Sequence, residues 1–301
     1  MINKVKILGS LLLKLETRSK TGSGRKMLLL NISYFIPGVF LPWILLKQNA
    51  DPTGFQFSFL TFLFYSLIIA FTIITELDNL ITSKTEAEIL AAMPIDLKLL
   101  VNAKMYMITR YLLLLSLPLL LPGSIYYYAI LRSFPRALLF YISALMLCFF
   151  TANVLILLYS MALKVFRTKS VGSYTMIFQA GMILLLIMAY QFISFGITGR
   201  PGSSVNGYIA SLQQKGVIDY FPPAWFAFLT TRNQYLFEAG LIVKLVMPLL
   251  ITILSYFSLK MYLDENYVHI RDKFLNSRII STGGIEKKRF ESFAAQLSGV
   301  E

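Results

Sequence analysis

The sequence has few of the residues on which most enzyme chemistry depends. Its 301 residues include one cysteine, Cys148, and one histidine, His269. A lone cysteine excludes an intramolecular disulfide, and a lone histidine excludes a histidine-based metal site or triad within one chain. Neither a GxSxG elbow nor an HExxH helix occurs. The sequence therefore predicts no active site and no cofactor of its own.

Charged residues are also scarce, at 14% of the chain against roughly 25% in soluble domains, whereas 56% of the residues are apolar. Uninterrupted apolar stretches of about 20 residues recur, which is the length that crosses ~30 Å of hydrocarbon. Because lipid offers the backbone no hydrogen-bond partner, these stretches predict helices. We expect an all-α, polytopic membrane protein with six spans, at Met27–Leu46, Phe55–Ile74, Tyr111–Leu131, Ala137–Leu163, Tyr174–Ile197 and Gly240–Leu259.

The net charge of +13 would suggest a nucleic-acid partner in a soluble protein. In a membrane protein such an excess of cations sets topology and attracts anionic headgroups. With a cytoplasmic N-terminus, 21 of the 28 Lys and Arg residues fall on inside segments. We therefore expect both termini to lie on the cytoplasmic side of the membrane. We also expect the chain to interact with the lipid bilayer and not with nucleic acid.

Polar segments flank and divide the spans. Residues 1–26 predict an interfacial helix, with apolar residues every three or four positions from Ile2 to Leu15, followed by the flexible basic linker TGSGRK. The linker lacks the GxxxxGK[ST] spacing of a phosphate-binding loop, so the chain is not expected to hydrolyse ATP. Residues 264–301 form a basic cytoplasmic tail.

The spans themselves contain almost no ionisable residues, apart from Lys244 near a helix end. Carriers coupled to protons or ions need such groups within the membrane, so the power for any transport is expected to come from elsewhere. Prolines occur in two spans, and each removes a backbone donor and can kink its helix. The candidate hinges are Pro37, Pro42, Pro118 and Pro122, although kinked membrane helices are common without such a role.

The polar stretch between the second and third spans, residues 75–110, predicts a helical hairpin. Ser83 and Thr85 stand three residues before Glu86 and Glu88, as in a capping box. Pro94 ends this first helix. Asp96 can cap a second helix that runs through Lys98 and Lys104 toward the third span. A charged hairpin of this kind suits docking of a soluble partner, or simply lies among the headgroups.

The stretch LDNLITSKTEAEILAAMPIDLKLLVNAKMYMITRYLLLL resembles the loop between the second and third spans of type-two ABC exporter permeases. The matching positions are Asp78, Met93, Pro94, Ile95, Ala103 and Lys104, with Met93 in place of the commoner leucine. The resemblance implies a permease subunit of a bacterial plasma (inner) membrane, coupled through this hairpin to a separate ATPase that carries ATP and Mg. It also implies a homodimer or a pairing with a second permease half, since related chains are often much longer.

The same resemblance implies short helices outside the membrane between the last two spans. The predicted outer loop 198–239 contains YFPPAWFAFL, where Pro222 and Pro223 can start a helix and Trp225 and Phe226 suit the membrane interface. We therefore expect an interfacial or re-entrant helix at this place.

Two other functions fit the same sequence. A non-transporting membrane scaffold or assembly factor would share the topology. A membrane-embedded lipid-modifying enzyme would need Glu76 and Asp78, the close acidic pair at a span end, to bind a metal. Spans this apolar would tolerate lipids, hydrophobic peptides or drug-like molecules as the substrate of a transporter.

Overall fold

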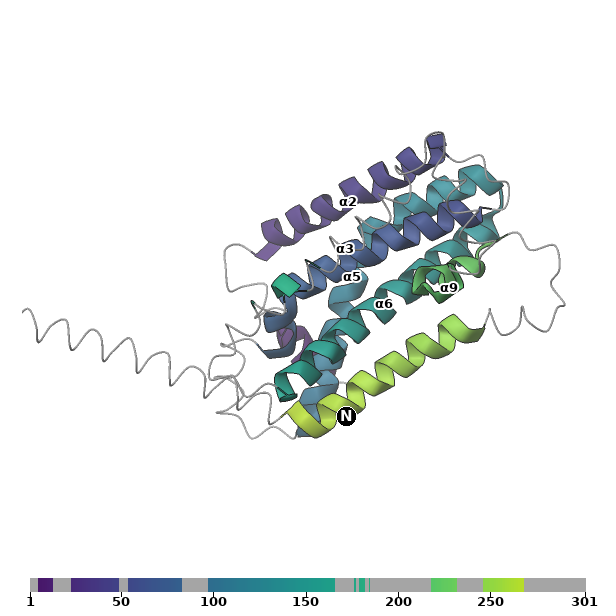
Figure 1. Cartoon of the computed structure of the whole chain (residues 1–301). Coiled ribbons are helices and arrows are strands. Elements are labelled where there is room, and N and C mark those ends of the chain that lie inside the picture. Colours follow the sequence, from purple (N-terminus) through teal and green to yellow (C-terminus); the bar gives the residue numbers. More distant parts are fainter. Residues whose placement is uncertain are drawn as a thin grey trace, which may run out of the picture.

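The computed structural model describes residues 5–12, 23–48, 54–82, 97–165, 176, 179–181, 184, 218–231 and 246–267. Every regular element within these ranges is a helix, and the long helices lie side by side (Figure 1). The elements are residues 5–12, α2 (Ser23–Gln48), α3 (Phe55–Thr82), α5 (Leu97–Leu131), α6 (Phe134–Val165), η1 (Ile218–Tyr220), α9 (Pro222–Phe228) and a C-terminal helix (Val246–Tyr267).

Four of these helices are long and apolar enough to cross a membrane, namely Phe55–Leu77 of α3, Leu97–Leu131, Phe134–Ala162 of α6 and Val246–Tyr267. A shorter apolar segment, Ile32–Leu45, lies in α2. The prediction of an all-helical, multi-pass membrane protein is therefore confirmed.

Contacts between helices fix their directions. Tyr34 of α2 and Thr72 of α3 are joined by a hydrogen bond of 2.6 Å between their hydroxyl oxygens. Gly38 of α2 lies against the backbone of Leu119 in α5. The middles of α2, α3 and α5 therefore lie at one level. One end of the bundle, the α3–α5 end, holds the start of α2, the end of α3 and the start of α5. The other, the α5–α6 end, holds the start of α3 and the turn between α5 and α6.

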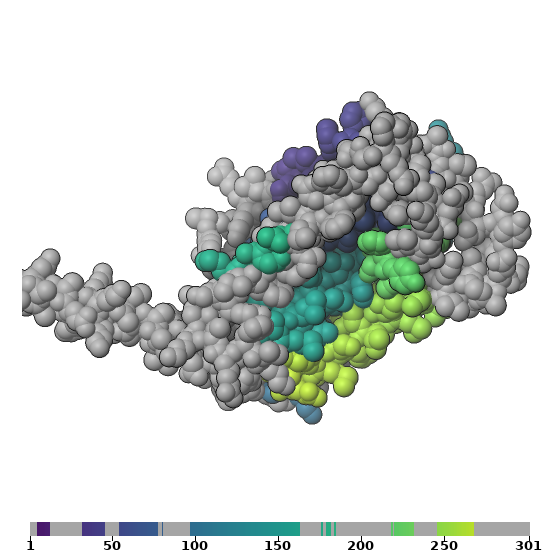
Figure 2. Space-filling model, viewed as in Figure 1, coloured from purple at the N-terminus to yellow at the C-terminus, as the bar shows by residue number. Residues whose placement is uncertain are grey.

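The C-terminal helix runs along α6 in the same direction (Figure 2). The Asn153 amide donates a hydrogen bond to Ser255 Oγ at 3.4 Å, and the Tyr262 hydroxyl donates one to the Ser160 carbonyl at 3.2 Å. Polar bonds of this kind hold membrane helices together, because lipid tails provide no hydrophobic drive for their association. Both α6 and the C-terminal helix therefore end at the α3–α5 end.

Aromatic rings fill the core toward the α5–α6 end. The Phe140 ring of α6 lies 4.8 Å from the Phe62 ring and 4.7 Å from the Tyr127 ring, measured between centroids. The Phe57 ring stacks on Tyr127 at 6.0 Å. Offset contacts at these distances are favourable for aromatic pairs, so α3, α5 and α6 are locked together here.

The turn between α5 and α6 is tight. Arg132 has a positive φ of 52°, and its N–H donates to the Tyr128 carbonyl at 2.7 Å. The Ser133 carbonyl then accepts the first α6 bond, from Ala137 N at 3.1 Å. An arginine therefore occupies the left-handed position that glycine usually takes at the end of a helix.

Several helix limits differ from the prediction. α5 begins at Leu97, so the predicted third span and the second hairpin helix form one rod. α2 begins at Ser23 and includes part of the predicted flexible linker. The last helix occupies Val246–Tyr267, shifted from the predicted Gly240–Leu259. Most of the predicted fifth span, Tyr174–Ile197, lies outside the described residues.

The four candidate hinge prolines lie inside helices that continue past them. Pro37 and Pro42 are within α2, and Pro118 and Pro122 are within α5. Pro42 and Pro122 are buried. Each proline removes one helical hydrogen bond, which marks where these helices bend most easily.

Candidate functional site

The charged hairpin lies at the α3–α5 end, and the structure describes only its second helix. Glu86, Glu88, Pro94 and Asp96 lie outside the described residues. Lys98 is in the first turn of α5 and is exposed, as a docking surface requires. The sequence reasoning placed this lysine correctly on an accessible part of the helix.

Lys104 differs from the prediction. Its side chain is only 1% exposed, whereas partner binding requires an accessible group. Burial of an ammonium group is costly unless the charge is paired. The Lys104 side chain is thus part of the packed interior of the bundle and not of its surface. Lys104 is therefore removed from the predicted docking surface.

The N-terminal helix, residues 5–12, covers this part of α5. A Cβ atom on Gly9 would lie 2.7 Å from Tyr106 Cδ1 and 2.9 Å from the Ala103 carbonyl oxygen. Leu12 is buried, and Leu8 packs against the core. The predicted apolar face thus contacts α5, while Ile7 and Leu11 remain 61% and 49% exposed. Sequence reasoning found the helix but not this contact.

At the α5–α6 end, α9 is held by a set of polar contacts. Pro222 and Pro223 occupy its first positions, which suits proline because the first N–H groups of a helix have no partner within it. Just beyond the helix, Thr230 Oγ1 donates to Ser58 Oγ at 2.8 Å. The Tyr127 hydroxyl donates to the Thr230 carbonyl at 2.5 Å.

Burial shows that α9 is inserted into the bundle. Phe226 is 0% exposed, and its ring centroid lies 6.0 Å from that of Phe150. Phe150 is near the middle of α6, about 24 Å from the first residue at 1.5 Å per residue. Phe226 therefore packs within the protein, which fits the re-entrant alternative predicted for this helix. Trp225 is half-buried.

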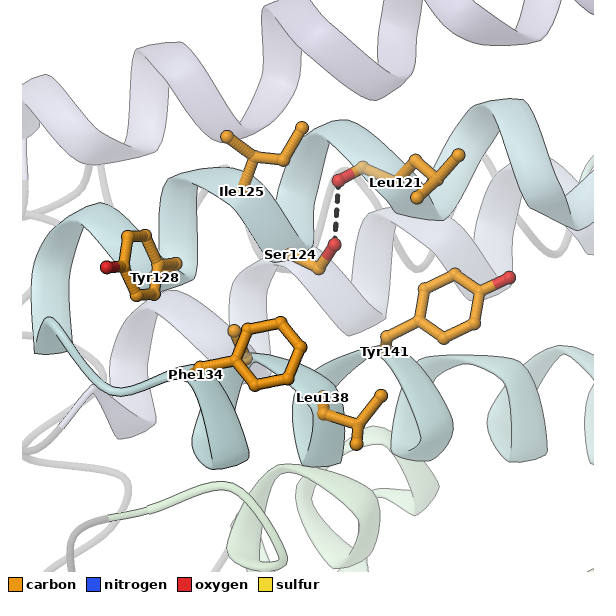
Figure 3. Close-up of a pocket in the computed structure, with 8 residues that line it drawn as sticks. Leu121, Ser124, Ile125, Tyr128, Phe134, Leu138 and Tyr141 are labelled. Atoms are coloured by element: carbon orange, nitrogen blue, oxygen red, sulfur yellow. Dashed lines mark hydrogen bonds between the residues drawn. The ribbon is translucent and has the colours of Figure 1, made fainter.

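A groove opens between α5 and α6 near their connecting turn, with a volume of about 620 Å³. In Figure 3 Ser124 and Phe134 lie between the two helices, while Ile125 and Leu121 extend from the opposite side of α5. The described residues that line this α5–α6 groove are Leu121, Ser124, Ile125, Tyr128, Phe134, Ala137, Leu138 and Tyr141. Sequence reasoning missed the groove, because it depends on which faces of the two helices pack together.

The acidic pair considered for a metal site is described only in part. Glu76 is half-buried in α3, and the Asp78 side chain lies outside the described set. Among the side chains that the structure describes, no group of three His, Cys, Asp or Glu residues could hold a metal ion.

No protein-family model, curated protein or solved structure gives a significant match to the chain.

Proposed function

We propose that the chain is the membrane-spanning subunit of an ATP-driven exporter, coupled to a separate ATPase through residues 83–98. The observation that carries the proposal is the continuity of α5, which extends without a break from Leu97 to Leu131. At 1.5 Å per residue this rod is about 50 Å long, enough to connect a docking surface to the far side of a membrane. A push on Lys98 would move the packed bundle directly.

The directions of the helices support six spans with both ends on one side. The first residues of α2 lie at the α3–α5 end of the bundle. The last residues of α6 and of the C-terminal helix lie at the same end. α9 lies toward the opposite end, where Thr230 contacts Ser58. In this proposal the chain crosses once more between α6 and α9, and the predicted span Tyr174–Ile197 is the segment expected to do so. The excess of Lys and Arg on the α3–α5 side supports a cytoplasmic position for that end, in a bacterial plasma membrane.

The interior of the bundle supports an external source of energy. Along α3 and α6 the buried polar side chains include Ser58, Thr61, Ser143 and Asn153, which are uncharged, while the buried cation Lys104 lies in α5, seven residues from its start at the α3–α5 end. Uncharged hydroxyl and amide groups stabilise helix packing but do not bind a driving proton. A second copy or a second permease half completes the transport path in this proposal.

The first test is topological. In a Cys148→Ala background, which removes the one native cysteine, Lys98→Cys should react with a membrane-impermeant maleimide only after the cells are opened. Labelling of Lys98→Cys in intact cells would place the proposed docking surface outside and refute coupling to a cytoplasmic ATPase.

The second test measures coupling itself. The genes beside that of this chain would first be searched for an ABC ATPase. The chain would then be co-expressed with that ATPase, and co-purification and ATPase stimulation would be measured. We expect Lys98→Glu, and the combination Pro94→Gly, Glu86→Lys and Asp96→Lys, to reduce both readouts severalfold. Arg110→Glu is the matched control, because Arg110 is also an exposed cation on α5 but lies about 18 Å farther along the helix.

The outcome separates the transporter from the scaffold. If the hairpin variants leave both co-purification and stimulation intact, the coupling role is wrong. If the wild-type chain recruits a partner but does not change its ATPase activity, the scaffold hypothesis is favoured.

A further inference from the structure

The α5–α6 groove faces outward and is lined almost entirely by hydrocarbon. Ile125 and Phe134, on its two sides, are 65% and 70% exposed. The Ser124 hydroxyl donates to the Leu121 carbonyl of its own helix at 2.7 Å, which leaves the groove floor without a free polar group there (Figure 3). Its volume of about 620 Å³ is within the roughly 300–1,000 Å³ of known ligand pockets.

In a membrane the groove wall meets lipid tails. Tails are as apolar as leucine, so the groove alone gives no preference for one lipid over another. Any preference must come from a polar group at the end of the groove that reaches the headgroups.

Arg132 stands at that end. It lies in the turn between Tyr128 and Phe134, which line the groove on α5 and α6, and its N–H donates to the Tyr128 carbonyl at 2.7 Å. Its side chain is exposed. The acidic side chains that the structure describes, Glu76, Asp264 and Glu265, are all in helices at the α3–α5 end. Among the side chains that the structure describes, no carboxylate lies beside this guanidinium.

The backbone at Arg132 gives an independent reason to assign it a role. A φ of 52° is strained for a side chain with a Cβ, and glycine would avoid the strain. At Gly54, the other positive φ among the described residues, the chain does use glycine. Strain that a simple substitution would remove is typical of positions kept for function.

We propose that the α5–α6 groove binds an acyl chain of an anionic phospholipid from the surrounding bilayer, and that Arg132 binds the headgroup phosphate. Guanidinium and phosphate form charge-assisted, bidentate hydrogen bonds, and the acyl chain lies between Tyr128 and Phe134. This site does not depend on the proposed exporter function, because lipid binding needs neither ATP nor a partner. Either proposal can fail without the other.

The test uses the purified full-length protein in phosphatidylcholine vesicles. Spin-labelled phosphatidylglycerol and phosphatidylcholine with identical chains would be compared for the fraction of motionally restricted lipid. One basic residue near a membrane surface favours an anionic lipid by about 1 kcal/mol, which is a roughly fivefold preference for phosphatidylglycerol at low salt. Added salt should weaken this preference.

The variants separate the headgroup from the groove. Arg132→Gly suits the positive φ, so it should fold normally and reduce the preference to the level set by the other Lys and Arg residues, whereas Arg132→Lys should keep most of it. Ser124→Trp fills the groove while leaving Arg132 in place, and should reduce the preference by a similar amount. Arg136→Gln is the matched control, because successive helix residues turn by about 100° and Arg136 points away from the face of Phe134 and Tyr141.

Each alternative has its own outcome. Equal restriction of the two lipids by the wild-type protein would overturn the proposal, as would a preference that Arg132→Gly leaves unchanged. If Arg136→Gln reduced the preference for phosphatidylglycerol as much as Arg132→Gly does, the preference would come from diffuse surface charge and not from a specific site. Displacement of the lipid by soluble glycerol phosphate would show an anion site that needs no acyl chain. Circular dichroism checks folding, and Ser124→Trp keeps the test valid if Arg132→Gly is unstable.

Discussion

Substituting Gly38 tests the closest backbone contact between two long helices. A Cβ atom at this position would lie 2.6 Å from the Leu119 carbonyl oxygen and 3.1 Å from the Leu119 carbonyl carbon and Cα. These are backbone atoms of α5, so no side-chain rotation can relieve the overlap. Overpacking lowers the free energy of unfolding by about 1–3 kcal/mol, and the higher helix propensity of alanine offsets up to ~1 kcal/mol of this loss. We expect Gly38→Ala to lower the free energy of unfolding by about 1–2 kcal/mol.

The assay is reversible unfolding of the purified protein by sodium dodecyl sulfate in mixed micelles, followed by circular dichroism. Gly181→Ala is the control, because Gly181 is helical and a Cβ there meets nothing within 4 Å. This variant should be unchanged or more stable. A Gly38→Ala protein as stable as the wild type would refute the close packing of α2 on α5. Rescue of Gly38→Ala by a second substitution, Leu119→Ala, would refute it as well. Gly38 contacts the backbone of Leu119, so truncating the Leu119 side chain should not change the effect of Gly38→Ala, and the coupling energy between the two substitutions should be near zero.

Two further substitutions test the attachment of α9 and the start of α3. Thr230→Val removes the bond to Ser58, and we expect a loss of about 1–2 kcal/mol in the same assay; Thr231→Val, whose hydroxyl bonds only within its own segment, should cost less than half as much. Gly54→Ala combines a φ of 72° with a Cβ placed 3.0 Å from the Tyr127 ring, and should cost about 1–3 kcal/mol; a neutral effect would contradict the tight contact there.

The sequence alone identifies the chain as a helical membrane protein, because this assignment depends on the length and hydropathy of each segment and not on its neighbours. An apolar run of 20 residues needs its own helical hydrogen bonds in lipid, whatever its neighbours are. The second hairpin helix and the third span were predicted as separate elements, whereas the structure joins them into one helix, α5. The limits of the helices were less accurate, because residues beyond the hydrocarbon, such as those from Glu76 to Thr82, carry no hydropathy signal.

The positions of individual side chains depend on packing, which one sequence does not reveal. Lys104 and Lys98 look alike on a charged helix, yet one is buried and the other exposed. Likewise, Trp225 and Phe226 suit both a membrane interface and a protein core. The burial of Phe226 is decided by the presence of Phe150 on α6, a contact between residues far apart in the chain.

The structure connects the two ends of the bundle through α5. Near its start, Ala103 and Tyr106 contact the N-terminal helix, and near its end Tyr127 holds the Thr230 carbonyl at 2.5 Å. Helix movements in switching proteins are typically about 1–2 Å, which is enough to lengthen such a bond beyond hydrogen-bonding distance. Pro118 and Pro122 lie between the two contacts, so bending there would tilt the end that holds α9. A partner acting on the first turn of α5 would thus release or fix the inserted helix at the far side.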